Sequence, residues 1–324
     1  MKVAIVGIGH IAKHQANAIQ QLADTIDLVG AYDRDVSVAQ KRVLPCEFHK
    51  SLDDLIENSP ADIVVVSTTN HDHFATASRL LSAGRAVMVE KPVCEKAEDL
   101  QQLVSLAKAG NLFFHTALHA TFAADLRWWA EHRQMLAHRF GPVERIQMGF
   151  YDPYMERDGT VKKQALGLDG SWYDSGINAL STLSLIADPA SIKITGGAMF
   201  SSPHVACEQI NGSAELTCMV DGHVAAGKID TNWALGLDRK TTTLAYQNGT
   251  VVLDHSQEHV VIRDGKFTET ISLQNGLPRL TNHYIGVFQD LETAFAKGQD
   301  NIARSCQLHE LLFAAVTAAK RVPV

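Results

Sequence analysis

The sequence predicts a two-domain α/β protein, in which a parallel-sheet domain precedes an α+β domain with a large, mainly antiparallel open sheet. Over the first 120 or so residues, short apolar runs alternate with amphipathic stretches, as they do in βαβ units. After about residue 205, turn dipeptides separate β-prone runs, which is typical of antiparallel hairpins. The 324 residues exceed one ordinary core and suit two domains. We therefore expect domains at residues 1–120 and 121–324.

The strands expected in the first domain are near-continuous apolar runs, as buried parallel strands are. They are Val3–Val6, Leu28–Tyr32, Ile63–Val66, Val87–Val89 and Leu112–His115. Hydrophobic periodicity predicts helices at about 11–22, 35–43, 51–57, 72–83 and 96–109, and a further helix over 120–138 that leads out of the domain.

In the second domain, three dipeptides mark tight turns: Asp221-Gly222, Asn248-Gly249 and Asp264-Gly265. We expect them to supply the positive φ that hairpin turns need. The strands around them are predicted at roughly 213–220, 223–231, 240–247, 250–254, 258–263 and 266–272. Two helices, at about 281–297 and 302–320, close the chain.

Composition excludes several classes of protein. The formal net charge is −7 and the basic residues are scattered, which argues against a nucleic-acid partner. No apolar run reaches the ~18 residues of a membrane helix, and the strand that begins at Lys2 leaves no room for a signal peptide. The cysteines are far apart and form no C-x-x-C; they are Cys46, Cys94, Cys207, Cys218 and Cys306. We expect reduced thiols, no metal site and a cytoplasmic location.

A glycine-rich segment predicts a nucleotide site. Gly7, Gly9 and Ala12 form G-x-G-x-x-A between the first strand and the first helix. Gly7 permits the tight turn, Gly9 lets backbone N–H groups approach a pyrophosphate, and Ala12 keeps the helix close to the sheet. Asp33 closes the second strand, where a carboxylate binds the adenosine ribose hydroxyls and repels a 2′-phosphate. The pattern predicts a Rossmann domain that prefers NAD. The adjacent Arg34 can meet a 2′-phosphate, so NADP stays possible. The alternative is a glycine turn in an unrelated α/β protein.

A second segment supports this interpretation. Residues 67–92 include Asn70, His73, Ala83-Gly84 and Glu90-Lys91-Pro92. They resemble the Gfo/Idh/MocA oxidoreductase family, which carries T-P-N-x-x-H after the fourth strand and A-G-K-H-V and E-K-P around the fifth. Thr69 replaces the usual proline. Arg85-Ala86 replaces Lys-His. The resemblance extends from residue 1 to about 190, and the order of the domains fits to the end of the chain.

Lys91 lies at the carboxyl end of a central parallel strand, where open α/β sheets place ligands. A lysine there can bind a substrate oxygen and stabilise its developing charge. The resemblance implies that Lys91 bridges nicotinamide and substrate, oriented by Glu90. The alternative is a surface lysine beside a proline.

The pair His71 and His73 favours helix capping or cofactor contact over metal binding, because no third ligand is nearby. The expected cofactor-binding residues are Gly7, Gly9, His10, Ile11, Asp33, Arg34, Thr68, Asn70, His73, Glu90 and Lys91.

The stretch G-S-W-Y-D-S-G-I-N resembles the substrate-side motif D-x-G-x-H of the family. Asp174 and Gly176 match it, whereas Asn178 stands in place of the histidine. Residues four apart share one face of a helix, so Asp174 and Asn178 should lie together. Asparagine does not take up a proton at accessible pH, so acid–base chemistry falls to Asp174, to Lys91 or to both.

This departure resembles the L-arabinose and D-galactose 1-dehydrogenases of the family, which oxidise a pyranose at C1 to a lactone. F-H-T-A-L-H-A also resembles their segment with a histidine near the sugar, which corresponds to His119. Their W-H-P-G-Q-like loop is missing. The region with Lys162 and Lys163 replaces it, and these lysines can meet an acidic substrate or be merely solvated. Expected substrate-binding residues are Lys91, His119, Asp174, Asn178 and Trp233.

The sequence therefore predicts an NAD(P)-dependent dehydrogenase of a sugar, in which Asp174, aided by Lys91, accepts the proton of the C1 hydroxyl and Asn178 holds that hydroxyl. His119 and Trp233 are candidate pocket walls. Two alternatives stay open: a dehydrogenase of a ring secondary alcohol, and a non-catalytic regulator that senses NAD and sugar. The resemblance also implies a homo-oligomer that pairs through the C-terminal sheet.

Overall fold

The computed structural model describes residues 1–35, 37, 44–201 and 210–323, which form two compact units. Unit 1 comprises Met1–His119 and Leu280–Cys306, and unit 2 comprises Ala120–Arg279 and Gln307–Val324. The predicted boundary near residue 120 coincides with the first junction. Residues 280–306, which the sequence assigned to the second domain, pack instead with unit 1.

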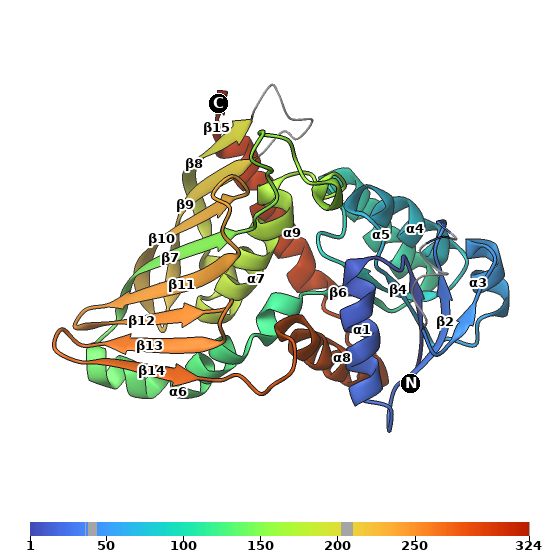
Figure 1. The fold of residues 1–324 in the computed structure, drawn as a ribbon, viewed down its shortest axis with the longest axis horizontal. Coiled ribbons are helices and arrows are strands. Elements are labelled where there is room, and N and C mark those ends of the chain that lie inside the picture. Colours follow the sequence, from blue (N-terminus) through green and yellow to red (C-terminus); the bar gives the residue numbers. More distant parts are fainter. Residues whose placement is uncertain (36, 38–43, 202–209, 324) are drawn as a thin grey trace. The chain divides into compact units, whose positions relative to one another are not determined.

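Unit 1 contains a six-stranded sheet in the order β3-β2-β1-β4-β5-β6, in which every pair is parallel (Figure 1). Its strands are β1 (Lys2–Val6), β2 (Asp27–Tyr32), β3 (Glu47–Phe48), β4 (Ile63–Val66), β5 (Ala86–Glu90) and β6 (Phe114–Ala117). This order reverses between β1 and β4, the switch point at which such sheets bind ligands at their carboxyl ends. All residues of β4 are buried, as expected of a strand covered on both faces.

The helices of unit 1 are α1 (His10–Gln21), α3 (Leu52–Asn58), α4 (Asn70–Ser82), α5 (Ala97–Gly110) and α8 (Arg279–Lys297). Helices α3, α4 and α5 pack on one face of the sheet in a shared apolar core. Most of the helix predicted over 35–43 lies outside the described residues. Helix α8 is joined to the rest of the unit by side-chain hydrogen bonds, among them Thr281 with His14 and Glu292 with Thr25.

Unit 2 contains a nine-stranded sheet in the order β14-β13-β12-β11-β7-β10-β9-β8-β15. Its strands are β7 (Val143–Tyr151), β8 (Lys193–Ser201), β9 (Asn211–Val220), β10 (His223–Asn232), β11 (Arg239–Tyr246), β12 (Gly249–Asp254), β13 (His259–Arg263), β14 (Thr268–Ser272) and β15 (Lys320–Pro323). The pairs β7–β10 and β8–β15 are parallel and the other pairs are antiparallel, which confirms the mainly antiparallel sheet.

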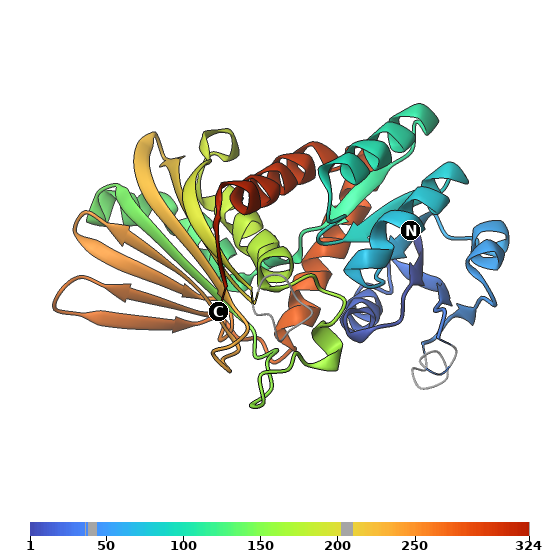
Figure 2. The same ribbon diagram turned by 90° about the horizontal axis from the view of Figure 1, so that it is seen from above.

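Helices cover one face of this sheet (Figure 2). They are α6 (Ala124–Phe140), α7 (Ile177–Ile186) and the part of α9 (Ile302–Ala318) beyond residue 306; short helical turns are η1 (His119–Phe122), η2 (Lys163–Ala165), η3 (Trp172–Gly176) and η4 (Pro189–Ser191). Two buried tryptophans connect these helices to their neighbours. Trp129 Nε1 of α6 donates to Tyr246 Oη of β11 (3.0 Å), and Trp172 Nε1 of η3 donates to the carbonyl of Leu312 in α9 (3.1 Å). Among the described helices, none combines the length and apolarity that a membrane crossing requires.

Two of the three predicted turns have the expected backbone. Asp221 and Gly222 have φ of 49° and 83°, and Gly265 has φ of 79°. At Asn248-Gly249 the predicted hairpin is present, since β11 and β12 pair antiparallel. The positive φ predicted there is wrong, because neither residue has one and Gly249 already lies in β12. A Cβ on Gly249 would stand 2.5 Å from the Phe140 ring, so packing rather than backbone conformation requires glycine there.

The described cysteines are free thiols, as predicted. Burial raises the pKa of the Cys46 and Cys218 thiols to about 11 and that of Cys94 to about 12, which makes these thiols unreactive near neutral pH. Cys207 lies outside the described residues.

Candidate functional site

The glycine loop of unit 1 is shaped as a phosphate cradle. Gly7 has φ of 90°, and a Cβ there would stand 2.6 Å from the backbone nitrogen of Thr68. Gly9 caps the N-terminus of α1, and the position of its missing Cβ has no atom within 4 Å. The start of α1 therefore borders open space in which a pyrophosphate can meet helix N–H groups. This part of the chain fits a dinucleotide.

The Asp33 carboxylate is fixed beside this loop. Its Oδ2 accepts a hydrogen bond from Ile8 N (2.6 Å), and its Oδ1 accepts one from Asp35 N (2.8 Å). Each carboxylate oxygen can accept a second hydrogen bond, so ribose hydroxyls can still bind. The neighbouring Arg34 is exposed and paired with Asp72, with nitrogen–oxygen distances of 3.1 and 3.0 Å.

Glu90, at the end of β5, is a buried carboxylate with donors from three places in the sequence. Gln15 Nε2 of α1 (2.8 Å) and Tyr284 Oη of α8 (2.7 Å) donate to Oε1, and the Lys91 backbone N–H donates to Oε2 (3.3 Å). Burial raises the pKa of Glu90 to about 6, although these donors and the Lys91 ammonium lower it. At neutral pH Glu90 is therefore mostly ionised and lies beside the Lys91 cation.

His73 links the two loops that carry the family motifs. Its Nδ1 is 2.7 Å from the carbonyl oxygen of Pro92, and its Nε2 is 3.2 Å from that of Thr68. Burial lowers the pKa of His73 to about 4, so the ring is neutral at pH 7 and the shorter contact assigns its proton to Nδ1. Both ring nitrogens contact backbone carbonyls, which is the geometry of a residue that positions the Glu90–Pro92 loop.

The other predicted cofactor residues lie at the same sheet edge. Asn70 is buried at the start of α4, and Thr68 precedes it. His10 and Ile11 form the first turn of α1, where His10 is exposed and its ring meets the His14 ring edge-on at 5.3 Å. The structure thus gathers all the predicted cofactor residues around the carboxyl ends of β1, β2, β4 and β5.

His119, a predicted sugar-pocket wall, is buried against α8. Its Nδ1 is 3.4 Å from Nδ1 of His283, and its ring centroid is 5.6 Å from that of Tyr284. The contacts described for His119 therefore belong to unit 1, and its role toward substrate stays a prediction.

In unit 2, Asp174 lies in a π-helical turn, η3, and not in the regular helix that the four-residue spacing predicted. Asn178 follows in α7 and its Nδ2 donates to the backbone carbonyl of Asp174 (3.3 Å). Asn178 Oδ1 is buried and has no hydrogen-bond partner among the described residues. A Cβ on Gly176 would stand 2.9 Å from the Trp172 ring, so this wide turn needs glycine. Such turns concentrate at functional sites.

A buried ion pair beside Asp174 was not visible in the sequence. Ser175 Oγ donates to Asp152 Oδ2 (2.7 Å), and Lys240 Nζ donates to Asp152 Oδ1 (2.5 Å). Asp152 directly follows β7 and Lys240 lies at the start of β11, so strand pairing joins residues 88 positions apart. The pair anchors the turn that carries Asp174.

Tyr154 is a further residue of this region that the sequence did not predict. Burial raises the pKa of this phenol far above its ordinary value, and the nearby Asp174 and Asp152 carboxylates raise it further, so the hydroxyl keeps its proton. The Tyr154 ring meets that of Trp233 edge-on at 5.3 Å. Trp233, a predicted pocket wall, is fully buried, and its Nε1 has no partner among the described residues. Unit 2 thus places a phenol, an indole and a carboxylate in one region.

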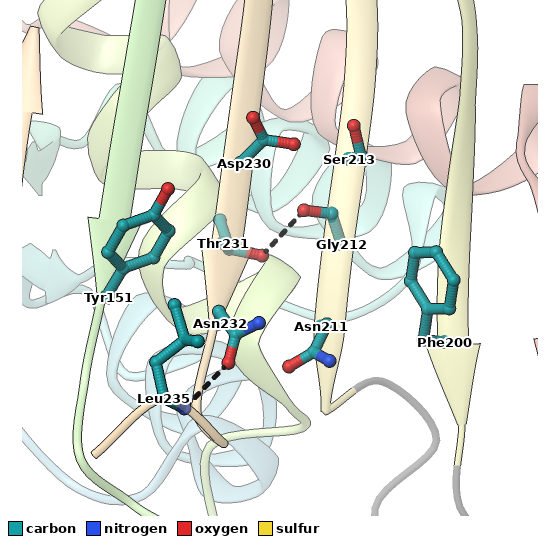
Figure 3. A pocket seen from close by; sticks show the side chains of 9 residues that line it. All are labelled: Tyr151, Phe200, Asn211, Gly212, Ser213, Asp230, Thr231, Asn232 and Leu235. Atoms are coloured by element: carbon teal, nitrogen blue, oxygen red, sulfur yellow. Dashed lines mark hydrogen bonds between the residues drawn. The ribbon is translucent and has the colours of Figure 1, made fainter. Parts of the chain in front are cut away.

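Unit 2 also has a cavity of about 310 Å³ (Figure 3). Its lining residues are Tyr151, Phe200, Asn211, Gly212, Ser213, Asp230, Thr231, Asn232 and Leu235. Thr231 Oγ1 is 3.0 Å from Ser171 Oγ, which precedes η3. Asp230 and Asn232 flank Thr231 along β10 and so point to the other face of the sheet. None of the predicted substrate residues lines this cavity.

Known proteins match both the N-terminal domain and the whole fold. Residues 1–117 match the family model GFO_IDH_MocA, described as "Oxidoreductase family, NAD-binding Rossmann fold". The scyllo-inositol 2-dehydrogenase (NADP(+)) of Bacillus subtilis (strain 168) is 24% identical over 299 residues, which are 86% of this chain and 85% of that protein.

Solved structures share the whole fold. A 3-ketoreductase from Actinomadura kijaniata, in complex with NADP and TDP-benzene, superposes with a TM-score of 0.85 at 17% identity, over 100% of this chain and 99% of the other. A levoglucosan dehydrogenase in complex with NADH and levoglucosan has a TM-score of 0.81 at 12% identity, over 98% and 97% of the two chains. These structures show the shared fold. The family match over residues 1–117, together with the cradle formed by Gly7, Gly9 and Asp33, identifies the chain as an NAD(P)-dependent oxidoreductase whose N-terminal domain matches the Gfo/Idh/MocA family.

Proposed function

We propose that this oxidoreductase dehydrogenates a hydroxyl-bearing ring carbon of a sugar or cyclitol. The observation that carries the proposal is the Lys91 cation beside the buried Glu90 carboxylate at the carboxyl end of a central strand in an NAD-binding sheet. Relatives and structural neighbours named for scyllo-inositol, levoglucosan and UDP-N-acetylglucosamine support this substrate class.

Unit 1 would hold the dinucleotide through the glycine loop and Asp33, and the bound nicotinamide supplies the hydride acceptor. Lys91 donates a hydrogen bond to the oxygen of the oxidised carbon and stabilises the negative charge that develops there. Glu90 compensates the charge of the ammonium and accepts a hydrogen bond from the Lys91 backbone N–H, and His73 fixes the loop through Pro92.

Asp174 of unit 2 accepts the hydroxyl proton, aided by Lys91. Asn178 Oδ1, a buried acceptor without a described partner, is suited to receive a hydrogen bond from a substrate hydroxyl. Trp233 Nε1 is suited to donate one. The Tyr154 ring, edge-on to Trp233, gives this region the aromatic surface that sugar rings favour.

Two positions on the ring are candidates. Oxidation of an aldose at C1 to its lactone is favoured by Asn178 in place of a histidine, because a hemiacetal hydroxyl is more acidic than a ring alcohol and needs a weaker base. Oxidation of a ring secondary alcohol is favoured by the relatives named as inositol 2-dehydrogenase and UDP-N-acetylglucosamine 3-dehydrogenase. We put the C1 reaction first.

The test measures NADH and NADPH formation with aldoses, uronic acids, inositols, methyl glycosides and levoglucosan. Methyl glycosides block C1, so turnover of free aldoses but not of their methyl glycosides, with a product trapped by hydroxylamine as a lactone, supports C1 oxidation. Turnover of inositols or methyl glycosides to a ketone supports the second candidate. Cofactor binding without turnover of any compound would refute both and favour a non-catalytic sensor.

A further inference from the structure

We propose that Asp72 determines cofactor specificity, because it holds the Arg34 guanidinium and so keeps this group from a 2′-phosphate. The inference rests on the proposed function only for the use of NAD(P), and not for the identity of the sugar. It assigns to α4 a part in a choice that the sequence attributed to Asp33 and Arg34 alone.

The contact between Arg34 and Asp72 involves both terminal nitrogens of the guanidinium and both oxygens of the carboxylate. Arg34 NH1 donates to Asp72 Oδ1 (3.1 Å), and Arg34 NH2 is 3.0 Å from Asp72 Oδ2. A bidentate arginine–carboxylate pair of this kind is stronger and more geometrically specific than a pair with a single hydrogen bond. The Arg34 side chain is 73% exposed, so a guanidinium that could swing toward solvent is held toward α4.

Thr69 prepares Asp72 for this contact. Thr69 is the N-cap residue of α4, and its Oγ1 donates to Asp72 Oδ2 (2.8 Å). A threonine stands here in place of the proline of the family motif, and proline has no hydroxyl to donate. Asp72 also lies in the first turn of α4, where the helix dipole favours a negative charge. The carboxylate is thus oriented before Arg34 binds it, which removes part of the entropy cost that weakens ordinary surface pairs.

The consequence for the cofactor follows from charge. Asp33, Arg34 and Asp72 together carry two negative charges and one positive charge, so a 2′-phosphate meets a net negative group. To bind that phosphate, Arg34 would have to leave Asp72 and expose an uncompensated carboxylate. An unphosphorylated ribose needs only Asp33 and leaves the pair intact.

The test measures dissociation constants of NAD⁺ and NADP⁺ by calorimetry without sugar substrate. Asp72→Asn keeps the shape and an acceptor for Thr69 but removes the charge. We expect its affinity for NADP⁺ to rise roughly fivefold to tenfold at low ionic strength, and its affinity for NAD⁺ to change less than about twofold. The gain should shrink in ~0.5 M salt, because Debye screening is then effective within a few ångströms.

Three variants make the result specific. Arg34→Ala combined with Asp72→Asn should show no gain, because the group released by the substitution is missing. Asp72→Glu keeps the charge and should keep the preference of the wild type. Asp53→Asn breaks the exposed pair between Arg79 and Asp53 in the same unit and should change neither constant. Equal changes for both cofactors, or a gain that persists without Arg34, would overturn the proposal. Failure to oxidise any sugar would leave these constants unaffected, so the two proposals fail separately.

Discussion

Each unit holds a buried carboxylate next to the residue expected to do chemistry, but the two carboxylates are held by different partners. In unit 1, Glu90 receives hydrogen bonds from the neutral donors Gln15 and Tyr284 and lies beside the cation of Lys91, the functional group itself. In unit 2, Asp152 is bound by Ser175 and by Lys240, a cation that also pairs with Asp238 and has no proposed part in the chemistry. In unit 1 the cation expected to act on the substrate also compensates the buried carboxylate, whereas in unit 2 a separate cation compensates it.

The largest expected effect tests the chemical role of unit 2. Asp174→Asn keeps the shape of the side chain and removes its basicity, so kcat should fall by on the order of a thousandfold. Steady-state rates with the best sugar of the panel measure this, and the dissociation constant of NAD⁺ should stay near that of the wild type. Asn178→Asp should be milder and move the pH–rate profile upward, because two adjacent carboxylates resist joint ionisation. An active Asp174→Asn with an inactive Asn178→Asp would reverse the assignment.

The second effect concerns the cation of unit 1. Lys91→Met keeps most of the stem and removes the ammonium, so kcat should fall by about a hundredfold or more. NAD⁺ affinity, followed by fluorescence quenching, should change much less. The Glu90 carboxylate then loses its neighbouring cation, so Lys91→Met with Glu90→Gln should be more stable to urea than Lys91→Met alone. Near-normal turnover of Lys91→Met would place the chemistry on other residues.

The third effect is on stability and concerns unit 2. Lys240→Met leaves Asp152 buried without its cation, which should lower the free energy of unfolding by about 3 kcal/mol. The double variant Asp152→Asn with Lys240→Met should recover most of that loss. Lys228→Met, which breaks the exposed pair with Asp230, is the matched control and should cost less than ~1 kcal/mol. Urea unfolding measures all three. Equal losses for Lys240→Met and Lys228→Met would show that the buried pair has no special role.

The same comparison shows how far the sequence predicts the site. Gly7, Asp33 and Lys91 stand where a strand ends, so a local pattern places each of them and the parallel sheet brings them together. Most strands of unit 2 were also predictable from alternation between turns. Strands β7, β8 and β15 were not predicted. No turn dipeptide brackets β7 or β8, β8 contains Gly196-Gly197, and β15 begins at Lys320, where the predicted last helix ends.

The residues that position Glu90 and Asp152 could not be predicted from the sequence, for a different reason. Tyr284 donates to Glu90 across 194 residues, and Lys240 reaches Asp152 across 88. No local spacing encodes such pairs, because they arise only when helix α8 packs on unit 1 and when β7 pairs with β11. The π-helical form of η3 could not be predicted for a third reason. Residue spacing alone assigns this turn to an α-helix, but Trp172 packs against Gly176 and the turn is wider.

The smallest expected effect is a change in the pKa of Glu90, which tests its hydrogen bond with Tyr284 in unit 1. Tyr284→Phe removes one of the neutral donors to Glu90 and keeps the aromatic ring in the core. Burial raises the pKa of Glu90 to about 6, and the Tyr284 hydroxyl is the first of the groups that oppose this rise. Burial also raises the pKa of Tyr284, so its hydroxyl stays protonated and can only donate to the carboxylate. Loss of this donor should raise the pKa of Glu90 by about one further unit, since a hydrogen bond to a charged group is worth about 1.5 kcal/mol.

The direction of the pH dependence follows from these signs. Because the pKa of Glu90 is raised in the folded protein above its ordinary value of 4.5, folded Glu90 binds its proton more tightly than unfolded Glu90. Its contribution to stability is therefore fully present below pH 4.5 and is lost as the pH rises through about 6. Activity runs the other way, because Lys91 needs the ionised carboxylate. The acid limb of kcat should lie near the pKa of Glu90 and move upward by about one unit in Tyr284→Phe, with rates near wild type above pH 8. Tyr246→Phe removes a buried hydroxyl bound to Trp129 in unit 2 and should leave the limb in place. A uniform loss of rate at every pH in Tyr284→Phe would mean that this tyrosine supports the fold and does not tune Glu90.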